Sequence, residues 1–375
     1  MPSEMERRKQ VGPRVSVFIP VYRGSDFLDE LLWELTCSGY ENKEIFVAID
    51  EPDERSFRAV EKYSGKVHFM ISQFRRGKVE ALNSAVEASS GEILVFLDAD
   101  VSLRGEGFLE CIVEEMRDAD ILDFRKGIIN ESFISRMVNY EFLGANLVSY
   151  LYSRLVGKCV GINGAAFAIR RSVFEEVGGF SRVISEDFDL ALKVLMRNGR
   201  FKYSERLEAH TRAPSCWRGW ISQRKRWSVG AGLWIKENWR RFLTCVADYP
   251  HIALPSLIIL FPVLTPLILN YALMNAPGYN VPNILPSFIT VQSGLWIPVT
   301  PYTAQLISKA LLALFISFLP FAAIFYAASK KLRLRFKIHE FLIYFFIYQP
   351  ISTLVLVGGI ITAFLFEKHN LDWKV

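Results

Sequence analysis

Two aspartates, Asp98 and Asp100, stand directly after the apolar run EILVFL. In an extended segment residues i and i+2 point the same way, so both carboxylates can face one ligand. Two carboxylates at a strand end, with water and phosphate oxygens completing the shell, suit Mg²⁺ or Mn²⁺. Such an ion would stabilise a diphosphate as a leaving group. Asp-x-Asp pairs also occur in solvated turns, but the place of this pair after an apolar strand favours a metal site.

Two further residues stand where a nucleotide could be bound. Asp50 ends the run KEIFVAI, and a carboxylate there suits a ribose or a nucleobase. The alternative for Asp50 is a helix cap before Pro52. Lys78 follows Arg75-Arg76-Gly77 at a loop-to-helix junction that suits a phosphate, and its alternative is an ordinary basic surface run.

Two groups in the middle of the chain supply the remaining chemistry. Glu186 and Asp187 precede an apolar helical pattern, where one carboxylate can act as general base, although acids also cap helices. Gln223, Arg226 and Trp227 lie at positions i, i+3 and i+4 and share a helical face. The ring suits a sugar or base, and the guanidinium suits a diphosphate.

The elements that position these residues alternate along the first hundred residues. Four short apolar runs predict strands, at 14–21, 43–50, 67–71 and 92–98, and the segments 26–35, 53–63 and 78–88 between them have helical spacing. This order predicts an α/β domain with a mostly parallel sheet covered on both faces. Ligands of such sheets bind outside the carboxyl ends of the strands, where Asp50 and Asp98 stand.

The second half of the chain begins with predicted helices at 130–158 and 185–197, separated by glycine-containing turns. A further helix is predicted over 217–241, in which Trp220, Trp227 and Trp234 recur every seven residues among many cations. This composition predicts an amphipathic helix at a membrane interface. The alternative is a core helix with snorkelling basic side chains.

The composition beyond residue 245 indicates a membrane region. The chain has 375 residues, 51% of them hydrophobic, and a net charge of +5, yet Asp248 and Lys309 are the only charged residues in 246–329. Three apolar stretches, at about 250–274, 304–329 and 339–366, each exceed the roughly 20 residues that cross a bilayer, whereas buried helices of a soluble protein are the alternative.

The charges beside these stretches predict an orientation. The loop at 330–337 is rich in Lys and Arg, while 275–303 has no charge, so the basic loop and the preceding domain are expected in the cytoplasm. The polar N-terminus lacks the apolar core of a signal peptide. Five cysteines without metal-binding spacing, Cys37, Cys111, Cys159, Cys216 and Cys245, agree with a reducing compartment. No nucleic-acid partner is expected.

The predicted layout is a basic tail at 1–13, an α/β domain at 14–216, the amphipathic helix at 217–245 and a membrane region at 246–375. Motifs over 14–240 stand in the order of a known family. They are Ile19-Pro20-Val21-Tyr22, Asp50, Gly77-Lys78, Asp98-Ala99-Asp100, Gly161–Arg171, Gly178-Gly179-Phe180, Glu186-Asp187 and Gln223–Trp227. The chain resembles a membrane-integrated family 2 glycosyltransferase, a type that includes hyaluronan, chitin and cellulose synthases.

The resemblance implies a GT-A fold and an inverting, β-forming transfer from a nucleotide sugar, usually a UDP-sugar. Asp98 and Asp100 would bind donor and Mg²⁺ or Mn²⁺, and Asp187, supported by Glu186, would be the base. The other residues that the resemblance places at the donor are Pro20, Tyr22, Asp50, Lys78, Gln223, Arg226 and Trp227.

The acceptor stays open at this point. A saccharide acceptor is the leading hypothesis, and a lipid acceptor (polyprenyl phosphate, ceramide-like lipid or glycerolipid) is the second. The sequence predicts no transmembrane helix before the α/β domain and three after it. Polysaccharide-secreting synthases generally have more transmembrane helices. A secreted polymer would therefore require an oligomer or a partner. An inactive membrane scaffold, the third hypothesis, would require damage to the acid set, and the sequence shows none.

Overall fold

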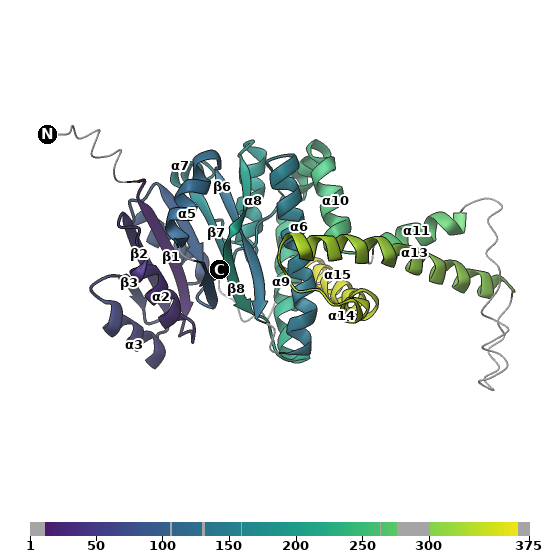
Figure 1. The fold of residues 1–375 in the computed structure, drawn as a ribbon, viewed down its shortest axis with the longest axis horizontal. Coiled ribbons are helices and arrows are strands. Elements are labelled where there is room, and N and C mark those ends of the chain that lie inside the picture. Colours follow the sequence, from purple (N-terminus) through teal and green to yellow (C-terminus); the bar gives the residue numbers. More distant parts are fainter. Residues whose placement is uncertain are drawn as a thin grey trace.

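The computed structural model describes residues 12–105, 107–129, 132–158, 160–262, 264–275 and 301–366. Within these residues one mixed sheet has the strand order β3-β2-β1-β4-β7-β6-β8-β5, with helices on its faces and a helical region beyond β8 (Figure 1). The strands are β1 Val15–Tyr22, β2 Lys43–Asp50, β3 His68–Ser72, β4 Ile93–Leu97, β5 Val101–Arg104, β6 Ile121–Ile129, β7 Ala166–Arg170 and β8 Phe201–Arg212.

The four strands predicted from the first hundred residues form the parallel part of this sheet. β2 pairs in parallel with β1 and β3, and β1 pairs in parallel with β4. In this register Tyr22 lies opposite Asp50, so both residues stand at the carboxyl edge. The remainder is more mixed than predicted: β7 is antiparallel to both neighbours, and β8 is parallel to β6 but antiparallel to β5.

Helices cover both faces of the sheet, as predicted for alternating strands and helices. They are α2 Leu28–Cys37, α3 Glu54–Tyr63, α4 Lys78–Glu87, α5 Phe108–Glu115, α6 Phe133–Leu155, α7 Arg171–Glu176 and α8 Glu186–Met196. Alternate residues of β1 enter different cores. Val17 packs with α2, α3 and α5, while Phe18 packs with α4, α6 and α8. On the second face Phe18 stacks between Phe46 and Phe96, at centroid distances of 5.7 and 5.2 Å.

The C-terminal helices are α9 Trp217–Asp248, α10 Pro250–Leu260, α11 Leu264–Asn275, α13 Pro301–Lys331, α14 Ile338–Ile343 and α15 Gln349–Leu365, with a π-helical turn at Tyr344–Tyr348 before α15. Among the described residues, Gln305–Lys331 and Ile338–Leu365 are long and apolar enough to cross a membrane. A third span exists if α9 and α10, which meet at a bend of 103°, count as one.

The stretch predicted as a span over 250–274 is not one helix in the structure. α10 ends at Leu260 and α11 begins at Leu264. The break surrounds Pro262, which has no amide proton to donate and whose ring clashes with the preceding helical turn. The predicted spans at 304–329 and 339–366 correspond to α13 and to α14–α15. The expected outer segment lies, for residues 276–300, outside the described part of the chain.

The basic loop between α13 and α14 packs against the sheet domain. Asn139 on α6 donates to the Arg335 carbonyl at 3.1 Å, and Tyr140 donates to the Lys337 carbonyl at 3.0 Å. Arg125 on β6 donates to the Leu332 carbonyl at 3.3 Å. The loop and the sheet domain therefore lie on one side of the C-terminal helices, as the charge distribution predicts, whichever compartment that side faces.

Two of the three tryptophans in the stripe of α9 are buried inside the protein, which corrects the expectation that the stripe faces a membrane interface. Trp220 and Trp234 are 0% and 1% exposed, and only Trp227, at 45%, reaches the surface. The indole N–H of Trp220 donates to the Tyr348 hydroxyl at 2.6 Å, and that of Trp234 donates to Asp189 at 2.9 Å. Buried indoles require such partners. The stripe is a packing surface against the π-helical turn and α8, so the alternative of a core helix is correct for these side chains.

Candidate functional site

A cavity of about 820 Å³ opens at the carboxyl edge of the parallel strands and extends along α9. All the residues that the sequence predicts for the site line it. They are Pro20, Tyr22, Asp50, Lys78, Asp98, Asp100, Glu186, Asp187, Gln223, Arg226 and Trp227. The structure thus brings together residues from Pro20 to Trp227, which are far apart in the sequence, while the role of each stays a prediction.

The two aspartates of the first motif lie in the tight connection between β4 and β5. The amide of Asp98 donates to the Ala165 carbonyl at 2.8 Å, and the amide of Val101 donates back to the Asp98 carbonyl at 3.2 Å. The carboxylate of Asp100 accepts from Thr211 of β8 at 3.3 Å. Burial and the neighbouring charge of Asp98 raise the pKa of Asp100 to about 6. A cation bound between the two carboxylates would relieve their repulsion.

Lys78 joins this turn to the second acid pair. Its ammonium lies 2.8 Å from Asp98 and 2.9 Å from Glu186. Although burial works against the charged form, the two carboxylates raise the pKa of Lys78 well above its ordinary value. Lys78 is the first residue of α4, at the predicted loop-to-helix junction, after Gly77 with φ of 108°. The ammonium therefore holds two acidic elements together at the centre of the cavity.

Asp50 fixes the loop that precedes Lys78. Its carboxylate accepts from the backbone amides of Arg76 and Gly77 at 2.8 and 2.9 Å and from the Arg76 guanidinium at 2.9 Å. The capping alternative is wrong for Asp50, because the N-cap of α3 is Asp53. Asp50 lines the cavity, while most of its hydrogen-bonding capacity orders residues 76 and 77.

Glu186 and Asp187 begin α8 but have different surroundings. Glu186 is buried against Lys78, and burial followed by the charge of Asp187 raises its pKa, against the effect of Lys78. Asp187 accepts from the amides of Gly164 and Phe188, both at 2.8 Å. A Cβ at position 164 would lie only 2.7 Å from the Asp187 carboxylate, so glycine permits this approach. The Asp187 carboxylate is thus fixed in orientation at the cavity wall.

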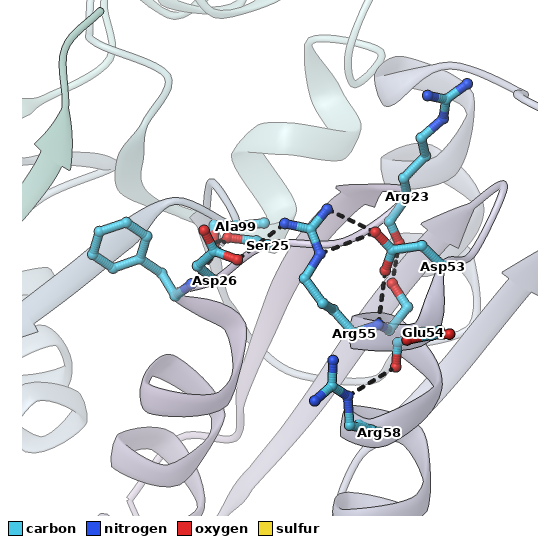
Figure 2. Close-up of polar contacts among 10 residues, drawn as sticks. Arg23, Ser25, Asp26, Asp53, Glu54, Arg55, Arg58 and Ala99 are labelled. Atoms are coloured by element: carbon cyan, nitrogen blue, oxygen red, sulfur yellow. Dashed lines mark hydrogen bonds and ion pairs between the residues drawn. The ribbon is translucent and has the colours of Figure 1, made fainter. Parts of the chain in front are cut away.

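The loop after β1 forms another wall and is anchored to the aspartate turn. Ser25 donates to the Ala99 carbonyl at 2.5 Å, and Arg55 bridges Asp26 and Asp53 at 3.0 and 2.7 Å. Figure 2 shows Arg55 between the two carboxylates and Ser25 beside Ala99. Ser25 belongs to no sequence motif, and only its contact with Ala99, seventy-four residues along the chain, places it at the site.

Arg224 is a further residue that the sequence does not single out, because it is one of many cations along this helix. It is buried, forms an ion pair with Glu141 of α6 and lies over the Trp227 ring at 4.3 Å. Glu141 also accepts from Ser352 of α15 at 3.1 Å. The α9 segment that carries Gln223, Arg226 and Trp227 is thereby tied to α6 and α15.

The carboxylates of the cavity fit a divalent cation that binds together with the phosphates of a substrate. Among the described residues no group of three or more His, Cys, Asp or Glu side chains is placed to hold a metal ion. Asp98 and Asp100 supply two carboxylates. Mg²⁺ and similar ions are commonly bound by one or two carboxylates together with substrate phosphates, so this pair fits a metal that arrives with a diphosphate.

Comparisons with known proteins agree with this arrangement. The sequence model of glycosyl transferase family group 2 matches residues 93–360, more than half of the chain. The probable glycosyltransferase YdaM of Bacillus subtilis (strain 168) is 26% identical over 243 residues, covering 61% of this chain and 58% of that protein. The poly-β-1,6-N-acetyl-D-glucosamine synthase of Staphylococcus aureus (strain MSSA476) is 25% identical over 224 residues, covering 58% and 54%. The chain thus spans a little over half the length of these curated relatives.

A solved structure of similar fold is the mannosyltransferase PcManGT from Pyrobaculum calidifontis, in complex with GDP-Man and Mn²⁺. The TM-score is 0.57 at 18% identity, and the match covers 95% of this chain and 88% of that one. This likeness shows a common fold, and the sheet domain is of the GT-A type. With a family match over residues 93–360, the chain belongs to glycosyl transferase family group 2.

Proposed function

We propose that this chain transfers a sugar from a nucleotide sugar, of the UDP type, to an acceptor hydroxyl with inversion at the anomeric carbon. The observation that carries the proposal is the single cavity in which the Asp98–Asp100 turn, the Glu186–Asp187 pair and the Gln223–Trp227 face of α9 meet. The first of these suits a diphosphate and its metal, the second a proton transfer, and the third a sugar and its acceptor.

Asp187 is the group best suited to take the acceptor proton. Each of its carboxylate oxygens accepts one backbone amide, which fixes the carboxylate and leaves a further lone pair on each oxygen. As the hydroxyl proton moves to Asp187, the acceptor oxygen forms a bond to the anomeric carbon. The bond from that carbon to the diphosphate breaks, and its electron pair leaves with the nucleoside diphosphate. Attack from the face opposite the diphosphate turns an α-linked donor into a β-linked product.

Glu186 and Lys78 support this chemistry without exchanging protons with the acceptor. Glu186 is buried and bound to the Lys78 ammonium at 2.9 Å, so its carboxylate is held beside Asp187 by that contact. Lys78 also holds Asp98, which keeps the aspartate turn beside α8. A divalent cation bound by Asp98 and Asp100 would offset the charge of the departing diphosphate.

Two acceptor classes remain as proposals. A saccharide acceptor is supported by the name of the S. aureus relative, a poly-β-1,6-N-acetyl-D-glucosamine synthase. A lipid acceptor is supported by the apolar side chains that line the α6 and α9 walls of the cavity. An inactive scaffold has no support, since every acid of the proposed mechanism is present in one cavity.

The proposal is tested by incubating the purified full chain with a panel of UDP- and GDP-sugars, with and without Mn²⁺. We expect release of a nucleoside diphosphate with at least one donor, only when the metal is present, and a glycosylated product in mass spectrometry. Absence of release with every donor, in membranes as well as in detergent, would contradict the proposal.

An Asp100→Asn variant tests the metal site. Removing one of two carboxylates should weaken metal-dependent donor binding by about tenfold or more. The measurement is donor affinity as a function of Mn²⁺ concentration. Asp118→Asn, at an exposed position outside the cavity, is the matched control and should bind the donor like the wild type. Equal donor affinity of the Asp100 variant with and without Mn²⁺ would remove this residue from the metal site.

A further inference from the structure

We call the part of the cavity lined by Asp50, Lys78, Asp98 and Asp100 the donor end. The part of the cavity beyond Asp187 differs from it in chemistry. We call it the apolar lobe and define it by six lining residues, Val138, Phe142, Ile184, Phe188, Ala231 and Ile235. None of the six side chains carries a polar group. They come from α6, from α8 and the turn before it, and from α9. The apolar lobe therefore exists only where three segments meet.

The face of α9 that lines the cavity changes its polarity along the helix. Gln223, Trp227, Ala231 and Ile235 follow one another at intervals of four residues and so lie on one face. All four line the cavity. From Gln223 to Ile235 this face spans roughly 18 Å at 1.5 Å per residue. The polar groups end at Trp227, and the side chains after it are apolar, so one continuous wall connects the donor end to the lobe.

The lobe begins at the proposed base. Phe188 directly follows Asp187, and its ring packs edge-on against the buried Trp234 at 5.0 Å. On the facing element, Val138 and Phe142 lie one turn apart on α6 and both line the cavity. An acceptor whose hydroxyl reaches Asp187 would thus have these apolar side chains beside the remainder of the molecule.

The walls of the lobe are also the elements on which the C-terminal helices pack. α6 contacts α10, α13 and α14, and α9 contacts α10 and α15. These include both segments that are long and apolar enough to cross a membrane. Figure 1 shows α6 and α9 between the sheet and the C-terminal helices. The lobe consequently lies between the acids of the site and the part of the chain suited to lipid.

We propose that the apolar lobe binds the hydrocarbon chain of a membrane lipid that serves as the acceptor, with the lipid's terminal hydroxyl at Asp187. This inference rests on the proposed transfer reaction and names its acceptor class. A saccharide in the lobe would leave its hydroxyl groups without hydrogen-bond partners from the six side chains, which is unfavourable. A hydrocarbon chain has no hydrogen bonds to lose in the lobe, and its binding there buries apolar surface.

The first experiment fills the lobe. In an Ile235→Trp variant the larger ring should exclude the chain, so transfer of radiolabelled sugar into organic-extractable product should fall by about tenfold or more. Binding of the nucleotide sugar should stay within about twofold of the wild type, which also reports that the variant folds. Leu243→Trp is the matched control, since Leu243 is 55% exposed on the same helix and lies outside the cavity lining; its lipid transfer should equal that of the wild type.

The second experiment does not depend on turnover. The full chain is placed in phosphatidylcholine vesicles that contain a long-chain fatty alcohol with a diazirine at its chain end, and crosslinked peptides are mapped after illumination. We expect crosslinks on α6 and α9 at lobe residues, and their loss in Ile235→Trp but not in Leu243→Trp. Crosslinks confined to α13 and α15 would overturn the inference.

The outcomes separate this inference from the reaction on which it rests. If donor turnover yields only water-soluble saccharide products, the lipid acceptor is wrong and the transferase stands. If Ile235→Trp and Leu243→Trp transfer sugar to lipid equally well, the lobe does not bind the chain of the acceptor, and the transferase again stands. If no nucleotide sugar is turned over while the lobe crosslinks as expected, the proposed reaction is wrong and the lobe still binds a hydrocarbon chain.

Discussion

The two ends of the cavity are built in different ways. At the donor end, charged side chains from distant elements hold one another, as in the contacts of Lys78 with Asp98 and Glu186. In the apolar lobe, side chains such as Phe142 and Ile235 define a shape and no charge. Buried charge pairs depend on geometry and fail when one partner is removed, whereas apolar walls tolerate exchange at constant volume. The donor end should therefore be sensitive to charge and the lobe to volume.

The largest effect is expected from a charge change that keeps volume. Asp187→Asn removes the base but retains the size of the side chain, so transfer should fall by about 10²- to 10⁴-fold. Donor affinity should change little, because the diphosphate is assigned to other residues. Turnover and donor binding, measured separately, check this expectation.

The matched control for that change is Asp29→Asn. Asp29 pairs with Lys62 at 2.7 Å on the surface of α2, outside the cavity lining, and its loss should leave turnover unchanged. Wild-type turnover in the Asp187 variant would remove this carboxylate from the mechanism. If Asp187→Asn lowered donor affinity and left the rate of transfer unchanged, Asp187 would be a donor-binding residue and would belong to the donor end.

The sequence could predict which residues meet at the donor end for a physical reason, whereas their roles stay predictions. The acids of the donor end directly follow apolar strands, as Asp50 and Asp98 do, and the carboxyl ends of parallel strands meet at one edge. The sequence could not predict the apolar lobe, because residues such as Val138, Ile184 and Ala231 have the composition of any core and meet only through the packing of α6, α8 and α9.

Two features of the helical region could not be predicted from the sequence: which side chains of α9 are buried, and where the stretch 250–274 breaks. The spacing of Trp220 and Trp234 correctly predicts that they share a helical face, but spacing does not show that the π-helical turn and α8 cover that face. Pro255, Pro262 and Pro266 predict a kink in the stretch 250–274, but the sequence does not show that the break falls around Pro262 while the other two prolines lie inside helices. Periodicity and composition describe one segment at a time, whereas burial and continuity depend on its neighbours.

A smaller effect is expected where the two ends meet. Along the face of α9 that lines the cavity, Trp227 is the last side chain with a hydrogen-bonding group. The Arg224 guanidinium lies 4.3 Å from the centre of the Trp227 ring. Arg224→Lys keeps the charge beside Glu141 but loses the planar stacking on the ring. A cation–π contact of about 1 kcal/mol corresponds to a roughly fivefold effect, so we expect KM to rise by about that factor with kcat less affected.

The control for Arg224→Lys is Arg218→Lys, at an exposed position earlier on α9, which should leave both constants unchanged. A thermal midpoint of Arg224→Lys near that of the wild type shows that the fold is intact. Equal KM values for the two variants would indicate that Arg224 only ties α9 to α6, and that the boundary between donor end and lobe does not depend on the orientation of Trp227.

The smallest effect is expected outside both ends, in the sheet itself. Glu208 of β8 accepts from His210 and from Arg125, each at 2.6 Å, and these contacts lower its pKa to about 2. Because the folded-state pKa lies below the ordinary value of about 4.3, the stabilisation is complete above that value and is lost as the pH falls toward 2. Glu208→Gln should therefore lower the free energy of unfolding by roughly 1 kcal/mol near pH 7, and the difference from wild type should shrink below about pH 4.

Thermal midpoints of both proteins across that pH range measure the effect, and Glu114→Gln provides the matched control. Glu114 pairs with Arg206 at 2.7 Å, but both side chains are more than half exposed, so its removal should leave the midpoint unchanged. A constant difference between Glu208→Gln and wild type at every pH would mean that the glutamate acts through packing rather than charge. Because Glu208 lines neither the donor end nor the lobe, its substitution should lower stability while the KM for donor and the transfer to lipid stay at wild-type values, which separates the scaffold from the two ends it supports.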